Sequence, residues 1–521
     1  MVMHLCIPIS DEGNPHQKAT NQVIPQLQEI NGETIIQRIL SSFPKEWPTH
    51  FIITETYKNT GLEEHLRDLR PRGTIQYMSS HNRGPAWTLS PLLPSLPDND
   101  SIFVSYSDYS KIWDAKAFER FVNNTECDVC IPSYRGFHPL QRSRHTAYSD
   151  ISNDRVTDII DRNFDNDGFE EKFSSSGGFY FKKIGLLRRA IERQIIDDIH
   201  DDGAYHFSLT IKSLMKNADV DVRIFEVPYF FQLATPESIE SFAYHERTFK
   251  AACLYPGKEM LMEQVLIPMA DNQAEFKTIF DTPQPFIPIR GTPMYRKAME
   301  TLPQGGKKSI VALDYMEKHF QDGDDPVNFL PGPKPQELGS IVSGLAALDL
   351  NRPVLISGYD HGIALAPSVW KKFLTINCVD GAVFTIKGYP IAQDELNAYS
   401  YAQTDEDGSD FPIVKNISEK STSKKPLHQK LVVGTYWFRS VKLLKQYING
   451  VDLADSSLHG VIHQMIADKL NIVSLPLDGF INWKTPKALA ESLYWEELFY
   501  GQRTRIRSKF EGCGSITSAL P

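Results

Sequence analysis

The amino-acid sequence predicts an α/β fold in two tandem domains, each organised around a mixed, mainly parallel β-sheet. Two observations lead to this prediction. Short apolar runs bounded by turn residues alternate with helix-like stretches along the chain, which is the pattern of βαβ units. The second half of the chain then repeats features of the first half in the same order, and the 521 residues are enough for two large domains.

The expected strands of the first half are short apolar segments at residues 5–9, 51–54, 102–106, 129–132 and 222–227. Helical periodicity is expected over residues 33–42 and 184–196. The second half repeats the alternation, with expected strands at residues 265–269, 310–313, 354–357, 382–386 and 472–475. Each half therefore supplies enough strands for a sheet of its own.

The repetition extends to short sequence matches. Ile7-Pro8 returns as Ile267-Pro268, residues 105–108 match residues 357–360, and residues 177–181 match residues 434–438. The matches are roughly 250–260 residues apart, which indicates a duplicated domain, since solenoid repeats have periods of about 20–50 residues. We therefore expect one domain at residues 1–255 and a second at residues 256–521.

Composition excludes several classes of function. The formal net charge of −10 argues against nucleic acid as a partner, because no excess of Lys and Arg is available to neutralise phosphates. No run of about 18 apolar residues occurs, so we expect no membrane span. Six cysteines are too few for a disulfide framework, and we expect a cytoplasmic protein. Cys127 and Cys130 have the spacing of half a zinc site, but no second pair follows, and core cysteines are the expected alternative.

Several segments of the second half carry the motifs of one known family. Residues 266–276 form an apolar strand containing Ile-Pro and a loop, and residues 282–294 contain Pro-Gln-Pro-Phe and end in Gly-Thr-Pro-Met. An Asp follows the strand that begins at Val354, an Ile-Ser-Glu-Lys run covers residues 417–420, and Asn-Trp-x-Thr-Pro covers residues 482–486. In these segments the chain resembles the sugar-phosphate nucleotidyltransferases, or NDP-sugar pyrophosphorylases, which have a GT-A-like, Rossmann-type fold. The resemblance extends over nearly the whole chain, twice.

The resemblance implies a reaction in which a sugar-phosphate oxygen attacks the α-phosphorus of a nucleoside triphosphate. This reaction brings anionic groups together, so carboxylates are needed to hold Mg²⁺ and cations are needed to face the phosphates. The family pattern implies Asp360 and Asp478 as Mg²⁺ ligands in the second domain and Asp108 as a ligand in the first. It implies Asp360 and Lys420 as catalytic residues. The implied substrate-binding residues are Gly84, Lys172, Gln284, Gly332, Lys334, Glu419, Gly434 and Asn482.

The segments expected to bind phosphate depart from the family pattern. A glycine-rich loop lets backbone N–H groups approach phosphates closely. Residues 271–275 contain two acidic residues and no glycine, and residues 10–14 contain two acidic residues and one glycine. Gln26 and Gln284 stand where the family has a lysine. Either another substrate is used, or these loops no longer hold a triphosphate.

Each chemical candidate also has a structural alternative. Asp360 could cap a loop or helix, and Asp478 could be a turn residue in its Asp-Gly pair. Lys420 could form a surface ion pair with Glu419, and Asp108 could cap a helix.

The leading functional prediction is a nucleotidyltransferase. Its second domain would transfer a nucleotidyl group from a nucleoside triphosphate to a phosphorylated sugar or related small molecule, with Mg²⁺, for surface polysaccharide (capsule or lipopolysaccharide) biosynthesis. The first domain would be structural or regulatory. The first alternative is a catalytically inactive sensor or scaffold that binds a nucleotide sugar. A GT-A glycosyltransferase ranks last, because no Asp-x-Asp pair occurs at Asp108 or Asp360. A homo-oligomer is compatible with the sequence.

Overall fold

The computed structural model describes residues 2–10, 24–139, 147–160, 172–217, 219–254, 257, 260–269, 274–320, 325–331, 337–391, 396, 398–405, 408–418, 429–449 and 457–505. The chain divides into two compact units, Met1–Ile239 (unit 1) and Glu240–Pro521 (unit 2). The division lies within helix α7 (Pro236–Leu254), ahead of the boundary expected after residue 255. Most of α7 belongs to unit 2, because the Tyr244 hydroxyl both donates to Phe480 O and accepts from Phe480 N, each at 3.0 Å.

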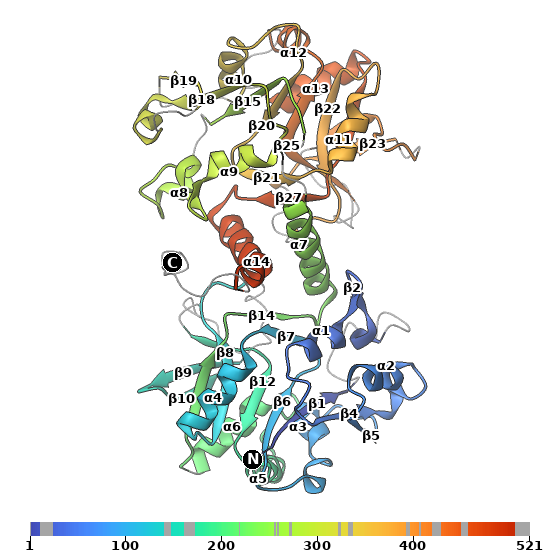
Figure 1. The fold of residues 1–521 in the computed structure, drawn as a ribbon, viewed down its shortest axis with the longest axis vertical. Coiled ribbons are helices and arrows are strands. Elements are labelled where there is room, and N and C mark those ends of the chain that lie inside the picture. Colours follow the sequence, from blue (N-terminus) through green and yellow to red (C-terminus); the bar gives the residue numbers. More distant parts are fainter. Residues whose placement is uncertain are drawn as a thin grey trace. The chain divides into compact units, whose positions relative to one another are not determined.

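Unit 1 is built on a mixed ten-stranded sheet. Its strands are β1 (Met3–Ile9), β4 (Thr49–Thr54), β5 (Thr74–Met78), β6 (Ser101–Ser105), β8 (Val129–Tyr134), β9 (Tyr148–Ser152), β10 (Arg155–Ile160), β11 (Phe173–Ser175), β12 (Gly178–Phe181) and β13 (Val222–Glu226). They follow the order β10-β9-β11-β8-β12-β6-β1-β4-β5, and β13 pairs with β8. Strands β6, β1, β4 and β5 are parallel, whereas β12 runs antiparallel between β6 and β8 (Figure 1).

Two small sheets and six helices complete unit 1. The small sheets pair β2 (Glu29–Ile30) with β3 (Glu33–Thr34) and β7 (Tyr109–Ile112) with β14 (Tyr229–Gln232). The helices are α1 (Ile35–Ser41), α2 (Leu62–Leu69), α3 (Gly84–Leu89), α4 (Ala115–Thr125), α5 (Ile184–Ile196) and α6 (Phe207–Asn217). Side-chain caps explain where two of them begin, since Thr34 accepts from Gln37 N at α1 and Asp114 accepts from Ala117 N at α4.

Unit 2 is built on a nine-stranded sheet of the same kind. Its strands are β15 (Gln264–Pro268), β18 (Lys307–Leu313), β19 (Val327–Leu330), β20 (Val354–Ser357), β22 (Gly381–Ile386), β23 (Tyr401–Thr404), β24 (Val414–Ser418), β25 (Lys430–Phe438) and β26 (Ile472–Pro476). The order is β19-β18-β15-β20-β25-β22-β26, with β23 on β25 and β24 on β23. Two small sheets pair β16 (Pro288–Ile289) with β17 (Thr292–Pro293) and β21 (His361–Ala364) with β27 (Gly479–Asn482).

The helices of unit 2 are α8 (Ala274–Lys277), α9 (Met294–Thr301), α10 (Glu337–Leu345), α11 (Pro367–Leu374), α12 (Val441–Ile448), α13 (Leu458–Ala467) and α14 (Pro486–Arg505). Ser440 and Ser457 cap α12 and α13 through their hydroxyls. None of the described helices is long and apolar enough to cross a bilayer.

The two main sheets share their central strand order. The order β5-β4-β1-β6-β12-β8-β13 in unit 1 corresponds to β19-β18-β15-β20-β25-β22-β26 in unit 2. The register also corresponds, because Ser105 lies opposite Gly178 in one sheet and Ser357 lies opposite Thr435 in the other. These are the segments that match in the sequence, so the similarity of the two halves extends to the pairing of individual residues.

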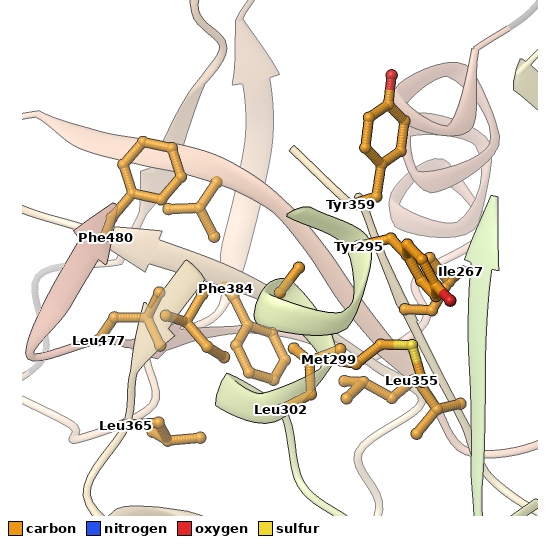
Figure 2. Close-up of a cluster of buried hydrophobic side chains, with 14 of the residues drawn as sticks. Ile267, Tyr295, Met299, Leu302, Leu355, Tyr359, Leu365, Phe384, Leu477 and Phe480 are labelled. Carbon is orange, nitrogen blue, oxygen red and sulfur yellow. The ribbon is translucent and has the colours of Figure 1, made fainter. Parts of the chain in front are cut away.

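The core of unit 2 brings side chains from strands and helices into one cluster (Figure 2). Ile267 and Leu355 enter it from the parallel strands, and Met299 enters it from α9. Burying an apolar side chain of this size stabilises the fold by roughly 1.5–3 kcal/mol. Tyr359 directs its hydroxyl away from the other labelled side chains in Figure 2, and that hydroxyl donates to Gln284 Oε1 at 3.2 Å.

Candidate functional site

Unit 2 contains a cavity of about 380 Å³ at the ends of two central strands. Pro268 ends β15 and lines the cavity, and residues 358–361, which follow β20, also line it. Strands β15 and β20 are parallel neighbours, so their carboxyl ends lie at the same edge of the sheet. This edge is where open α/β sheets bind their ligands.

Asp360 lines this cavity immediately before strand β21. Its Oδ1 atom lies 2.9 Å from Nδ1 of His361. Burial raises the pKa of Asp360, but the hydrogen bond and electrostatic interaction with His361, together with the charge of Lys484, outweigh burial, so the pKa lies below its usual value. The carboxylate is therefore ionised at neutral pH.

Two hydroxyl groups continue the network behind His361. The Nε2 atom of His361 lies 2.9 Å from Thr435 Oγ1, which lies 2.9 Å from Ser357 Oγ. All three side chains are buried. With the proton on Nδ1, His361 donates to Asp360 and accepts from Thr435, which in turn accepts from Ser357. The imidazole is thereby held in one orientation beside the carboxylate.

Strand β27 contributes the amide of Asn482 and leads into the exposed cationic side chain of Lys484. Asn482 lies opposite His361 in the β21–β27 pair. Its side-chain amide donates to the hydroxyls of Tyr389 at 3.2 Å and Tyr399 at 2.9 Å, and its Oδ1 accepts from Lys484 N at 2.9 Å. Asn482 therefore holds the backbone at Lys484, whose exposed side chain also lines the cavity.

A second polar group lies on the wall formed by β25 and α13. The Tyr436 hydroxyl lies 2.7 Å from His459 Nε2, and Ser400 Oγ lies 3.4 Å from His459 Nδ1. Tyr399 and Phe480 add aromatic surface to the same cavity. The cavity thus offers charges, hydrogen-bonding groups and ring faces to a single ligand.

The structure does not bring Asp478, the second expected Mg²⁺ ligand, to Asp360. Strands β21 and β27 are antiparallel, and each aspartate precedes the first residue of one strand, so the two lie at opposite ends of the pair. At about 3.4 Å per residue, the separation along the strands is roughly 17 Å. Asp478 Oδ2 instead accepts from Ala366 N at 3.0 Å, where α11 begins. Asp478 is therefore a capping residue.

The described residues around Asp360 supply fewer ligands than the expected pair of aspartates for Mg²⁺. A magnesium ion needs several oxygen ligands at about 2.0–2.1 Å. Among the described residues that line the cavity, Asp360 is the one carboxylate, and Lys484 places an ammonium group at the same cavity. No cluster of three or more His, Cys, Asp or Glu side chains that could hold a metal occurs in the described part of the chain.

Cys127 and Cys130, which have the spacing of half a zinc site, are buried free thiols of unit 1.

The other expected site residues of unit 2 divide into two groups. Gln284 is buried, donates to Trp483 O at 3.0 Å and accepts from Tyr359, so it packs behind the cavity. Gly434 lines the cavity with φ of +86°, and a Cβ there would lie 3.4 Å from the His361 ring. Four expected residues fall outside the described ranges, namely Gly332, Lys334, Glu419 and Lys420.

The expected polar residues of unit 1 have structural partners. Asp108 Oδ2 lies 3.5 Å from Gln232 Nε2, and its backbone carbonyl accepts from Leu233 N at 2.7 Å. Lys172 forms an ion pair with Asp150 at 2.5 Å. Asp108 belongs to no metal-binding cluster among the described residues.

Gly84 in unit 1 is required by close packing of the backbone. It has φ of +77°, and a Cβ at this position would lie 2.9 Å from both N and O of Tyr205. Tyr205 also hydrogen-bonds to Arg83 O and Ala86 N on either side of Gly84. The glycine therefore packs against protein backbone and is not part of an open loop.

Aromatic side chains fill the region of unit 1 that corresponds to His361 in unit 2. Tyr109 begins β7 directly after Asp108, as His361 begins β21 directly after Asp360. A Cβ at Gly177 would lie 2.3 Å from the Tyr109 ring, and Tyr109 stacks on Phe230 with ring centroids 6.2 Å apart. Unit 1 therefore has an aromatic stack where unit 2 has a hydrogen-bonded imidazole.

Four residues at the unit 2 cavity and in its network were not predicted from the sequence as site residues, namely Ser357, His361, Thr435 and Lys484. His361 directly follows a candidate residue, and Lys484 occupies the variable position of the Asn-Trp-x-Thr-Pro segment. These residues could have been found by considering every polar residue within or next to the matched segments, including those to which the family motif gives no role.

No model of a known protein family matches the sequence. No curated protein matches it either.

Solved structures of two pyrophosphorylases and a CTP transferase are similar to part of the chain. A nucleoside-diphosphate-sugar pyrophosphorylase from Vibrio cholerae RC9 is 14% identical, with a TM-score of 0.37 over 45% of this chain and 97% of its own. An inositol-1-phosphate CTP transferase from T. maritima is 14% identical, with a TM-score of 0.37 over 46% of this chain and 92% of its own. A UDP-glucose pyrophosphorylase complexed with UDP-glucose is 15% identical, with a TM-score of 0.37 over 47% of this chain and 100% of its own.

Proposed function

We propose that this protein is nucleotidyltransferase-like and that unit 2 binds a nucleotide sugar, or the nucleotide and sugar phosphate from which one is made. The observation that carries the proposal is the meeting of Asp360, His361 and Lys484 at one cavity on the carboxyl edge of the sheet. A carboxylate accepts hydrogen bonds from sugar or ribose hydroxyls, and an ammonium group pairs with phosphate. Aromatic side chains in the same cavity can cover a ring face.

Binding is placed ahead of catalysis for two reasons. Asp478 caps α11 and does not share a ligand with Asp360. The opening segments of both halves carry acidic residues where the family pattern has its phosphate-binding loop, and like charges disfavour the approach of a triphosphate. Unit 1 is assigned a structural or regulatory role, because Tyr109 and Phe230 stack where unit 2 has its imidazole. We propose an activated sugar for capsule or lipopolysaccharide synthesis as the ligand, and the family resemblance of the sequence supports this choice.

Nucleotidyl transfer in unit 2 is the second candidate. The observation that favours it is the ionised carboxylate of Asp360, which is oriented by His361 and lines the cavity. In phosphate chemistry a carboxylate of this kind acts by holding a metal ion or by accepting a proton.

Two measurements on the full chain decide between these functions. Isothermal titration calorimetry with UDP-glucose, dTDP-glucose, ADP-glucose, GDP-mannose and CDP-glucose should detect binding of at least one. A pyrophosphate-release assay with the common nucleoside triphosphates and a panel of sugar 1-phosphates should detect no turnover. Turnover that is abolished in Asp360→Asn would establish the second candidate, and absence of both binding and turnover would reject the proposal.

A further inference from the structure

The charges at the unit 2 cavity differ from those of a divalent-metal site. Among the described lining residues, Asp360 is the one carboxylate and Lys484 the one ammonium or guanidinium group. The two histidines of the lining are engaged with neighbouring side chains, His361 with Asp360 and Thr435, and His459 with Tyr436. The formal charges of Asp360 and Lys484 therefore sum to zero before a ligand binds.

Asp360 already uses one oxygen within the protein. Oδ1 is bonded to the imidazole of His361, which is 4% exposed and is fixed from behind by Thr435. A divalent cation would have to bind the remaining oxygen and complete its coordination with water or with oxygens of the ligand, because Asp360 is the one carboxylate among the described lining residues. The nearest candidate from the family pattern, Asp478, lies at the other end of the β21–β27 pair.

Lys484 is held at its backbone and free at its ammonium group. Asn482 Oδ1 accepts from Lys484 N, and Asn482 is itself held by Tyr389, Tyr399 and Ser492. No hydrogen bond or ion pair of the Lys484 ammonium involves a residue that the structure describes, although its charge acts on Asp360. A lysine whose backbone is held in place and whose ammonium group has no partner among the described residues is suited to binding an anion that enters the cavity.

The corresponding ribbon of unit 1 lacks this cation. The β7–β14 pair places Gln232 opposite Tyr109, as the β21–β27 pair places Asn482 opposite His361. Two residues after Gln232 the chain has Ala234, where Lys484 follows Asn482 in unit 2. The two units thus differ at the position where unit 2 has the exposed lysine Lys484 and unit 1 has Ala234.

We infer that unit 2 binds the phosphate group of its ligand through the ammonium of Lys484, without a divalent metal, and that Asp360 accepts a hydrogen bond from a hydroxyl of the same ligand. This inference rests on the proposed function and narrows the ligand to a phosphorylated sugar or nucleotide sugar with a free hydroxyl near its phosphate. The Lys484 ammonium supplies the charge that a magnesium ion would otherwise provide. Removal of the Asp360 charge should then reduce repulsion of the phosphate.

The test measures binding of the same five nucleotide sugars to the full chain by calorimetry, in excess EDTA and in excess MgCl₂ at matched ionic strength. For any sugar that binds, the two affinities should agree within about threefold, because the proposed contacts need no metal and the matched ionic strength keeps charge screening the same in both buffers. Lys484→Gln should weaken binding about tenfold or more, since a charge-assisted contact to phosphate is lost. Lys484→Arg should retain most of the affinity, and Lys442→Gln, an exposed lysine of α12, should bind like the wild type.

The substitution Asp360→Asn distinguishes metal-free binding from binding through a metal ion held by Asp360, because the two predict opposite changes in ligand affinity. Without a metal, the variant should bind as tightly as the wild type or more tightly, because a negative charge beside the phosphate is removed while a hydrogen-bonding side chain remains. Binding that requires MgCl₂ and is lost in Asp360→Asn would overturn this inference and leave the proposed function intact. Binding of no nucleotide sugar in either buffer would overturn both.

Discussion

The Nδ1 atom of His361 lies 2.9 Å from Oδ1 of Asp360, and this contact orients the carboxylate at the unit 2 cavity. We expect His361→Phe, which keeps a ring but removes both nitrogens, to lower the free energy of unfolding by about 1–3 kcal/mol at neutral pH. The reason is that Asp360 and the buried hydroxyl of Thr435 each lose a partner. Urea unfolding of the full chain, followed by hydrogen exchange of unit 2 amides, measures the loss.

The pH dependence of this effect has a definite sign. The hydrogen bond from His361 helps to hold the pKa of Asp360 below its usual value. The stability it contributes is therefore present above the unfolded-state pKa of about 4 and is lost as the pH falls through the folded-state pKa. The difference in free energy of unfolding between the wild type and His361→Phe should become smaller below about pH 4. Ser357→Ala, at the far end of the network, should show a loss that does not change with pH, and a constant gap for His361→Phe would contradict the pairing with Asp360.

Asp478 provides a test of capping against metal binding. We expect Asp478→Ala to lower the free energy of unfolding by about 1 kcal/mol, because the N–H of Ala366 at the start of α11 loses its acceptor. Asp478→Asn, which keeps an oxygen acceptor, should cost less. Neither substitution should change the affinity for a nucleotide sugar. Calorimetry on both variants checks this, and a loss of affinity in Asp478→Asn would show that the carboxylate reaches the ligand.

Much of the fold could be predicted from the sequence, because it depends on local apolar patterns and on repetition. The expected strand at residues 354–357 coincides with β20, and residues 184–196 coincide with α5. The matched segments at residues 177–181 and 434–438 lie against β6 and β20 in the same register. A repeat that preserves side-chain alternation also preserves strand register, since a shift by one residue would reverse the buried face.

The site was harder to predict, because it depends on which ends of distant strands meet. An Asp-Gly pair at Asp478 indicates a turn, but only the antiparallel pairing of β27 with β21 shows that the turn lies away from Asp360. The same pairing brings Lys484 to the cavity from a position that the motif left unassigned. The local sequence shows which residue types are present, but it does not show how β21 and β27 pair, and this pairing decides which residues meet at the cavity.

Gly84 is expected to be essential for packing in unit 1. Gly84→Ala should lower the free energy of unfolding by about 2–4 kcal/mol, because a Cβ adds left-handed backbone strain and meets the backbone of Tyr205 at 2.9 Å. Gly32→Ala is the matched control, since Gly32 has φ of +90° with no atom within 4 Å of an added Cβ, and it should cost about 1 kcal/mol. Thermal and urea unfolding measure both. Equal losses would show that backbone strain alone accounts for the effect.

Lys111 is a buried lysine in unit 1, at a position that corresponds to the buried Ile363 of unit 2. It is 2% exposed, its Nζ has no hydrogen-bond partner among the described residues, and it lies 5.1 Å from the centre of the Phe43 ring and 5.7 Å from that of Phe103. Burial lowers the pKa of Lys111 to about 7, against a smaller opposing effect of Asp108. The folded state therefore disfavours the charged amine.

We expect Lys111→Met to stabilise unit 1 by about 2–4 kcal/mol near pH 6, because a charge without a hydrogen-bond partner is replaced by an apolar side chain of similar length. Between about pH 7 and pH 10 the unfolded chain binds a proton that the folded chain does not, so wild-type stability rises with pH. The advantage of Lys111→Met should therefore shrink as the pH rises through this range. Hydrogen exchange of β6 amides measures it, with Lys116→Met, an exposed lysine of α4, as a control within about 0.5 kcal/mol of the wild type. A destabilising Lys111→Met would instead show that cation–π contacts with the surrounding rings, each worth about 2 kcal/mol when desolvated, compensate for the burial of the ammonium group.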